Sequence, residues 1–126
     1  MPNILIVEDD PNQRMLYEKE LTREGYAVTT AADGAEALQK VHEEKWDLVI
    51  LDIRMPGMDG IEALGRILAI DRKIPVIINT AYASYKENFM TWAADAYIVK
   101  SSDLTHLKNA VMELLAKRKG ADAIVR

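Results

Sequence analysis

Short runs of apolar residues alternate along this chain with longer segments in which apolar residues recur every three or four positions. A short apolar run predicts a buried strand, and the longer periodic segments predict amphipathic helices. The predicted strands are 3–7, 26–30, 48–51, 74–79 and 96–99, and helices follow them at about 11–24, 34–44, 60–68, 84–92 and 103–119. Five such units with short connections predict an α/β fold in which helices cover both faces of a parallel sheet.

Polar residues and glycines mark the predicted ends of the helices. Each of the first four helices begins with a capping residue that is followed three positions later by Gln or Glu. These caps are Asp10, Asp33, Asp59 and Ser84. Glycine favours a helix end, so we expect the first helix to stop at Gly25 and the last at Gly120. In the first helix, the residues expected to face inward are Met15, Leu16, Tyr17 and Leu21.

The composition limits the possible classes of protein. With 126 residues, of which 49% are apolar and 29% charged, the chain fits one globular domain. It has no cysteine, which excludes disulfides and thiolate metal sites. We expect a cytoplasmic protein without membrane association, because no signal-peptide pattern is present and no apolar run approaches the ~18 residues that span a bilayer. The net charge of −4 disfavours direct nucleic-acid binding by this segment.

Polar residues follow the predicted strands at one edge of the sheet. Glu8 and Asp9 follow the first strand, Asp52 the third, Thr80 the fourth and Lys100 the fifth. The carboxyl ends of parallel strands share one edge, where ligands of open α/β sheets bind. In the flavodoxin-like order 2-1-3-4-5, the first and third strands are neighbours, so the three carboxylates would lie close together.

Three neighbouring carboxylates repel one another unless a cation intervenes. Mg²⁺ is the natural candidate, because it prefers oxygen ligands and binds together with phosphates. A lysine and a threonine hydroxyl beside such an ion suit the attack of an aspartate on phosphorus, which forms an acyl phosphate.

Four motifs resemble those of the receiver domain of two-component response regulators, over about residues 3–117. They are Ile-Leu-Ile-Val-Glu-Asp-Asp, Asp-Leu-Val-Ile-Leu-Asp-Ile-Arg-Met-Pro-Gly-Met-Asp-Gly, Asn-Thr-Ala-Tyr and Ala-Tyr-Ile-Val-Lys. Among receivers, the chain looks most like the single-domain sporulation-type regulators and the receivers of nitrogen-regulation-type activators. The fold implied is a flavodoxin-like (βα)5 three-layer sandwich.

The resemblance implies a phosphoacceptor site. Asp52 would accept a phosphoryl group from a phosphohistidine of a sensor histidine kinase or of a histidine phosphotransfer protein. Asp9, Asp52 and the backbone carbonyl of Arg54 would bind Mg²⁺, and Glu8 would act through a water molecule.

The resemblance also implies a switch. Lys100 and Thr80 would bind the phosphoryl group, and Tyr97 would turn inward as Thr80 moves. The surface of the fourth helix, fifth strand and fifth helix would change as a result. Arg54 and Tyr82 stand two residues after Asp52 and Thr80, at positions that in the family tune the attack of water. Both are large, so we expect them to shield the phosphoryl group.

Three positions depart from the family pattern. Ser101 replaces the usual proline after Lys100, and a cis bond before a non-proline residue costs about 3 kcal/mol. We therefore expect either a trans bond with altered loop geometry or a retained, strained cis bond. Thr80 and Lys100 are 20 positions apart, fewer than in relatives, which predicts a short or displaced fourth helix. Ala94 replaces a usual glycine, so the turn there should avoid positive φ.

The implied protein is a signalling switch rather than an enzyme, apart from its own phosphorylation and dephosphorylation. An aspartate-nucleophile phosphatase is an alternative, but that class needs an aspartate where Arg54 stands. Residues 1–119 would form the receiver domain, and 120–126 a C-terminal tail or the start of a linker. The output is then either binding of a downstream protein target or control of a missing effector domain, as in a multidomain transcriptional regulator.

Overall fold

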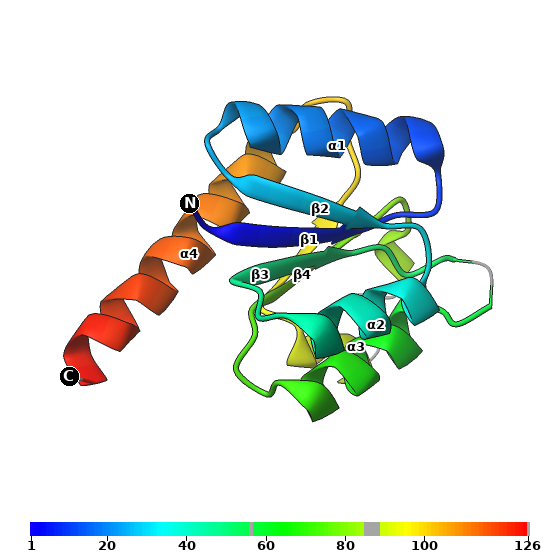
Figure 1. Cartoon of the computed structure of the whole chain (residues 1–126). Coiled ribbons are helices and arrows are strands. Elements are labelled where there is room, and N and C mark those ends of the chain that lie inside the picture. The colour runs from blue at the N-terminus through cyan, green and yellow to red at the C-terminus, as the bar shows by residue number, and fades with distance from the viewer. Residues whose placement is uncertain (56, 85–88, 126) are drawn as a thin grey trace.

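Five parallel strands form one sheet at the centre of the computed structural model of the chain, which describes residues 1–55, 57–84 and 89–125 (Figure 1). The strands are β1 (Asn3–Val7), β2 (Ala27–Ala31), β3 (Leu48–Leu51), β4 (Val76–Thr80) and β5 (Ala96–Val99). They lie in the order β2-β1-β3-β4-β5, and each neighbouring pair is parallel. The flavodoxin-like order expected from the sequence is confirmed.

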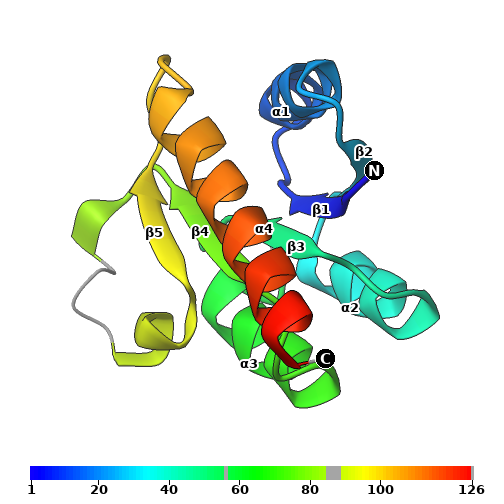
Figure 2. The ribbon, with the colours of Figure 1, turned by 90° about the vertical axis from the view of Figure 1, so that its left-hand side faces the viewer.

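Helices cover both faces of this sheet, which gives three layers (Figures 1 and 2). The residues of α1 (Pro11–Arg23) and α4 (Thr105–Val125) pack on one face, and those of α2 (Gly34–Glu43) and α3 (Gly60–Ile70) on the other. Successive strand residues alternate between the faces. In β3, Leu48 and Ile50 belong to the cluster under α1 and α4, whereas Val49 and Leu51 belong to the cluster under α2 and α3.

The predicted caps at the starts of three helices are confirmed. In each case a side-chain oxygen of the capping aspartate accepts the backbone N–H of the residue three positions on. The three capping residues are Asp10, Asp33 and Asp59. Gly25 ends α1 as expected: its φ is 96°, and its N–H and that of Tyr26 reach back to carbonyl groups of the last turn.

Two expectations about the helices were wrong. Tyr17 and Leu21 are buried, but Met15 is 66% and Leu16 45% exposed, because the buried stripe of α1 is narrow. The last helix does not stop at Gly120 but continues to Val125. A glycine inside a helix costs only about 1 kcal/mol relative to alanine, and such a cost does not force an end.

The described part of the connection between β4 and β5 differs from the helix that the sequence predicts. The helix predicted at 84–92 falls partly on residues 85–88, which lie outside the described residues. The next described element is a 3-10 helix, η2 (Phe89–Ala93). The expectation of a short or displaced fourth helix depends on the residues outside the described ranges and stays a prediction. Of the two outcomes expected for the Lys100–Ser101 bond, the structure has the trans form, and Ala94 avoids positive φ as expected. Within the described residues, no helix is both long and apolar enough to cross a membrane.

Candidate functional site

Three carboxylates meet where β1 and β3 end. Glu8 and Asp9 follow β1, and Asp52 follows β3, the neighbouring strand. One carboxylate oxygen from each of the three residues lies within 4.8 Å of the other two. Such a group of hard oxygen donors fits the coordination chemistry of a divalent cation such as Mg²⁺.

Lys100, which follows β5, reaches across the sheet edge to two of these carboxylates. Its Nζ donates to Glu8 Oε1 at 2.6 Å and to Asp52 Oδ2 at 2.8 Å. The side chains of Glu8 and Asp52 are almost entirely buried. The ammonium group therefore compensates negative charge that water screens only weakly.

Burial and neighbouring charges have opposite effects on the pKa values of Glu8 and Lys100. Burial raises the pKa of Glu8, although hydrogen bonds from Lys100 and from the Asp10 N–H oppose this effect. Burial also disfavours the charged form of Lys100, but its hydrogen bonds with Asp52 and Glu8 outweigh burial and raise the pKa of Lys100. The lysine is therefore held firmly in its charged form.

Backbone groups fix the acidic loop. Asp52 Oδ1 accepts the N–H of Ile53 at 2.7 Å, and Glu8 Oε2 accepts the N–H of Asp10 at 3.1 Å. Arg14 of α1 donates from Nη1 to the carbonyl oxygens of Glu8, at 2.9 Å, and Asp9, at 3.4 Å. Asp10 caps α1 and does not belong to the carboxylate group at the site.

A second set of contacts links β4 and β5 to the loop after Asp52. Thr80, the last residue of β4, is fully buried, and its Oγ1 accepts the N–H of Tyr82 at 3.4 Å. The hydroxyl of Tyr97 donates to the carbonyl oxygen of Tyr82. The guanidinium carbon of Arg54 lies 4.7 Å from the centre of the Tyr82 ring, which is a cation–π contact.

Sequence reasoning missed one polar pair beside the site. Tyr17 of α1 and Asn79 of β4 are both buried, and the Asn79 side chain is near enough to Tyr17 to lower the pKa of its phenol, against the larger effect of burial. Burial raises the pKa of Tyr17, and the charges of Lys100, Glu8 and Asp52 also act on this pKa, so the phenol lies close to the site. The only signal in the sequence was a polar residue near the end of an otherwise apolar strand.

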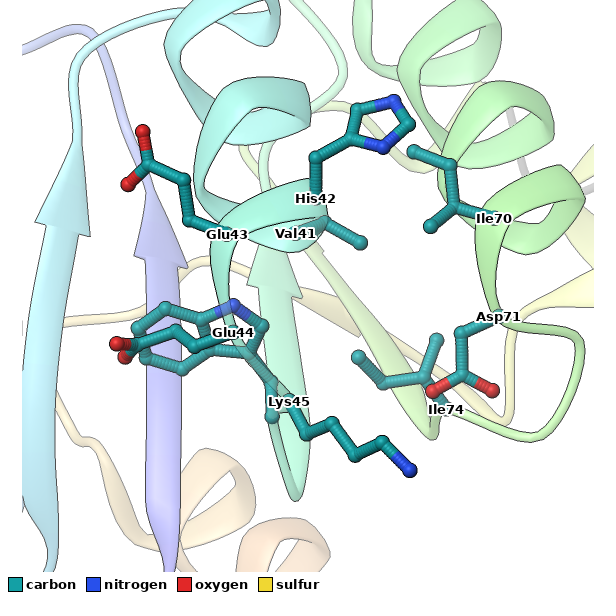
Figure 3. Close-up of a pocket in the computed structure, with 9 residues that line it drawn as sticks. Val41, His42, Glu43, Glu44, Lys45, Ile70, Asp71 and Ile74 are labelled. Atoms are coloured by element: carbon teal, nitrogen blue, oxygen red, sulfur yellow. The ribbon is translucent and has the colours of Figure 1, made fainter.

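Two hollows lie at opposite edges of the sheet. A shallow hollow of about 300 Å³ adjoins the carboxylate site and is lined by Gln13, Leu16, Tyr17, Lys100, Ser101 and Ser102. A larger one, of about 510 Å³, lies between the ends of α2 and α3 (Figure 3). Because these helices run back along the strands, their ends lie at the amino edge of the sheet. The larger hollow therefore takes no part in the site around Asp52.

Residues 4–112 match the family model of the response regulator receiver domain. The chain belongs to this family. Receivers of this kind belong to two-component systems, and phosphorylation and Mg²⁺ binding are typical of them. Sporulation initiation phosphotransferase F of Bacillus subtilis is 40% identical over 114 residues, which cover 89% of this chain and 92% of that protein. The transcriptional regulatory protein PrrA of Mycobacterium leprae is 37% identical over 124 residues, which cover 97% of this chain and 53% of PrrA. The chain thus spans about half the length of PrrA.

Solved structures of response regulators have the same fold. The response regulator TrrA of Thermotoga maritima, in complex with Mg²⁺–BeF, has a TM-score of 0.88 and 46% identity, covering 90% of this chain and 99% of that one. TrrA in complex with the histidine kinase ThkA has a TM-score of 0.86 and 46% identity, covering 91% of this chain and 99% of that one.

We predict that Glu8→Gln changes how the stability of the metal-free protein depends on pH. Burial raises the pKa of Glu8 in the folded state above its ordinary value of 4.5. At a pH between 4.5 and the folded pKa, the folded state therefore binds more protons than the unfolded state. The wild-type unfolding free energy should therefore contain a component that is fully present below pH 4.5 and is lost as the pH rises through the folded pKa. Glu8→Gln lacks this component. Urea unfolding of both proteins without divalent cations, from about pH 4 to 8, measures the difference; equal slopes would contradict it.

Proposed function

We propose that this chain is a phosphoacceptor switch of a two-component phosphorelay, in which Asp52 receives a phosphoryl group from a phosphohistidine. The observation that carries the proposal is the buried Asp52 carboxylate, grouped with Glu8 and Asp9 and bound by Lys100. A carboxylate oxygen of Asp52 attacks phosphorus, the P–N bond of the donor breaks, and its electron pair returns to the imidazole. The product is an acyl phosphate on Asp52.

A divalent cation completes this site. We propose that Asp9, Asp52 and the backbone carbonyl of Arg54 hold Mg²⁺, with Glu8 acting through a water molecule. When bound there, Mg²⁺ would supply positive charge to neutralise the oxygens of the transferring phosphoryl group. The spacing of the three carboxylates supports this assignment, as does the Mg²⁺–BeF complex of TrrA.

Lys100 and Thr80 would bind the new phosphoryl group. The Lys100 ammonium already contacts Asp52 Oδ2, so a short movement brings it to a phosphoryl oxygen. The hydroxyl of Thr80 would then donate to another oxygen. Because the Tyr82 amide contacts the Thr80 hydroxyl and the Tyr82 carbonyl contacts Tyr97, a movement of Thr80 reaches the aromatic ring on β5.

The output surface proposed here consists of η2, β5 and the face of α4 beside them. Its exposed apolar side chains include Trp92 and Val99, and exposed apolar groups favour the binding of a protein partner. That partner is either a separate protein or an effector domain that follows a receiver at 1–119, with residues 120–126 as tail or linker. We place this function in the cytoplasm and infer no turnover of an external substrate. The alternative is an aspartate-nucleophile phosphatase. That class needs a second aspartate two residues after the nucleophile, and this chain has Arg54 at that position.

The donor must approach Asp52 across the carboxyl edge of the sheet. The hollow beside Lys100 lies on this edge, and Leu16, which is 45% exposed, lines it. Met15, next to Leu16, is also exposed. We propose that a histidine kinase or a histidine phosphotransfer protein docks against Leu16, a partner that the complex of TrrA with ThkA supports.

Asp52→Ala should abolish phosphorylation, because it removes the carboxylate oxygen that is proposed to attack phosphorus. Wild type incubated with acetyl phosphate and Mg²⁺ should gain one phosphoryl group, read as an increase in intact mass, and the variant none. Omitting Mg²⁺ should also prevent the gain. A variant that is phosphorylated as fast as wild type would refute the proposed acceptor.

Replacing Arg54 and Tyr82 together with alanine should shorten the lifetime of the phosphoryl group. Without the stacked pair, water reaches the phosphoryl group more easily. We expect the phosphoryl group to be lost about tenfold faster, which corresponds to a barrier lower by about 1.4 kcal/mol. The remaining phosphorylated fraction, followed by intact mass after removal of the donor, measures the rate. An unchanged rate would refute the shielding role.

Leu16→Ala should weaken phosphotransfer from the cognate kinase by about tenfold, the size of a moderate interface contact. Phosphorylation by acetyl phosphate, which needs no docking, should stay at the wild-type rate. Met112→Ala is the matched control, because Met112 is an exposed apolar residue of α4 outside the hollow. Equal losses for both variants would argue against a docking role for this edge.

A further inference from the structure

The first residue of α3 lies directly against the backbone of the proposed phosphoacceptor. A Cβ atom added to Gly60 would stand 2.5 Å from the Cα of Ile53 and 2.8 Å from the carbonyl carbon of Asp52, and nearer still to the Asp52 carbonyl oxygen. All three are backbone atoms, which cannot turn aside as the end of a flexible side chain can. A side chain at position 60 would therefore push the Asp52–Ile53 peptide and the start of α3 apart.

The reason for a glycine at this position is space rather than backbone conformation. The described glycines with positive φ are Gly25 and Gly57, so Gly60 has a φ that other residues adopt. Gly60 also begins a helix, where alanine is preferred over glycine. Alanine at position 60 would thus suit the local conformation and would violate only the contact with the Asp52–Ile53 peptide.

Hydrogen bonds of Ile53, through both its carbonyl and its N–H, connect the start of α3 to the site. The N–H of Gly60 donates to the carbonyl oxygen of Ile53 at 2.7 Å. The N–H of Ile53 donates to Asp52 Oδ1 at 2.7 Å, and Asp52 Oδ2 accepts from Lys100 at 2.8 Å. The direction of the Asp52 carboxylate therefore depends on a peptide whose position depends on Gly60.

We infer that Gly60 is a positioning residue for phosphotransfer. Without a side chain, it lets the start of α3 rest on the Asp52–Ile53 peptide, which fixes the Asp52 carboxylate relative to Glu8 and Asp9. This role rests on the proposed function of Asp52. Ordinary contacts of a Cβ atom lie at 3.4–4 Å, and the added Cβ would stand far closer than that to the Asp52 carbonyl oxygen, so it demands a shift of more than about 1 Å. Misplacement of a reacting group by about 1 Å can slow a reaction about a hundredfold.

Gly60→Ala tests this role against Gly65→Ala. Gly65 lies in the same helix, and a Cβ added there meets nothing within 4 Å. We expect Gly60→Ala to slow phosphorylation by acetyl phosphate about a hundredfold, measured by intact mass, and to weaken Mg²⁺ binding, measured by calorimetry. Gly65→Ala should match wild type in both. A folded Gly60→Ala variant that matches wild type in both measurements overturns the inference.

Asp33→Ala separates positioning from stability. It removes the cap of α2 and destabilises the fold without changing a residue of the site. Under conditions where urea unfolding shows each variant to be folded, Asp33→Ala should keep its phosphorylation rate and Mg²⁺ affinity. If Asp33→Ala loses as much of both as Gly60→Ala, the effect is one of stability and the inference is overturned.

A measurement on wild type keeps the test valid if Gly60→Ala does not fold. The amide hydrogen of Gly60 should be protected from exchange both without ligand and with Mg²⁺ and acetyl phosphate, because α3 stays seated on the Asp52–Ile53 peptide. Loss of this protection on phosphorylation overturns the inference. If wild type takes up no phosphoryl group, the proposed function fails by itself, while the Mg²⁺ affinities of Gly60→Ala and Gly65→Ala still test the positioning role.

Discussion

The bridge from Lys100 to Glu8 and Asp52 is the contact on which the site depends. The strand order makes β1 and β3 neighbours, and so brings two buried carboxylates together where water cannot separate their charges. A lysine that follows β5, at the far side of the sheet, supplies the opposite charge through hydrogen bonds of 2.6 and 2.8 Å. The strand order thus brings like charges together, and the Lys100 side chain compensates their repulsion. The same concentration of negative charge makes the site suitable for a divalent cation.

Much of the fold could be predicted from the sequence because its signals are local. The continuous run Leu48–Leu51 identified a strand buried on both faces, and Asp10, Asp33 and Asp59 marked helix starts that the structure has. The grouping of acidic residues also followed from topology, since the carboxyl ends of parallel strands meet at one edge. The chemical roles of these residues stay predictions, because placing side chains together does not by itself demonstrate a reaction.

The features that could not be predicted depend on contacts between distant parts of the chain. Periodicity gives the direction of a buried stripe but not its width, so the exposure of Leu16 was missed. Asn79 looks like an ordinary strand residue until the fold brings Tyr17 of α1 beside it. Gly60 gives no sign in the sequence that its missing side chain leaves room for the backbone of Asp52. Each case is decided by a neighbour that local sequence patterns do not contain.

Tyr82 joins two of the proposed properties in one residue. Its ring carries the guanidinium of Arg54 beside the acceptor loop, while its backbone carbonyl accepts the Tyr97 hydroxyl on β5. Under the proposed function, the lifetime of the phosphoryl group and the change of the output surface both depend on this residue. A substitution of Tyr82 that changes the duration of the response therefore also affects the output surface. A substitution of Arg54 changes the duration with less effect on that surface.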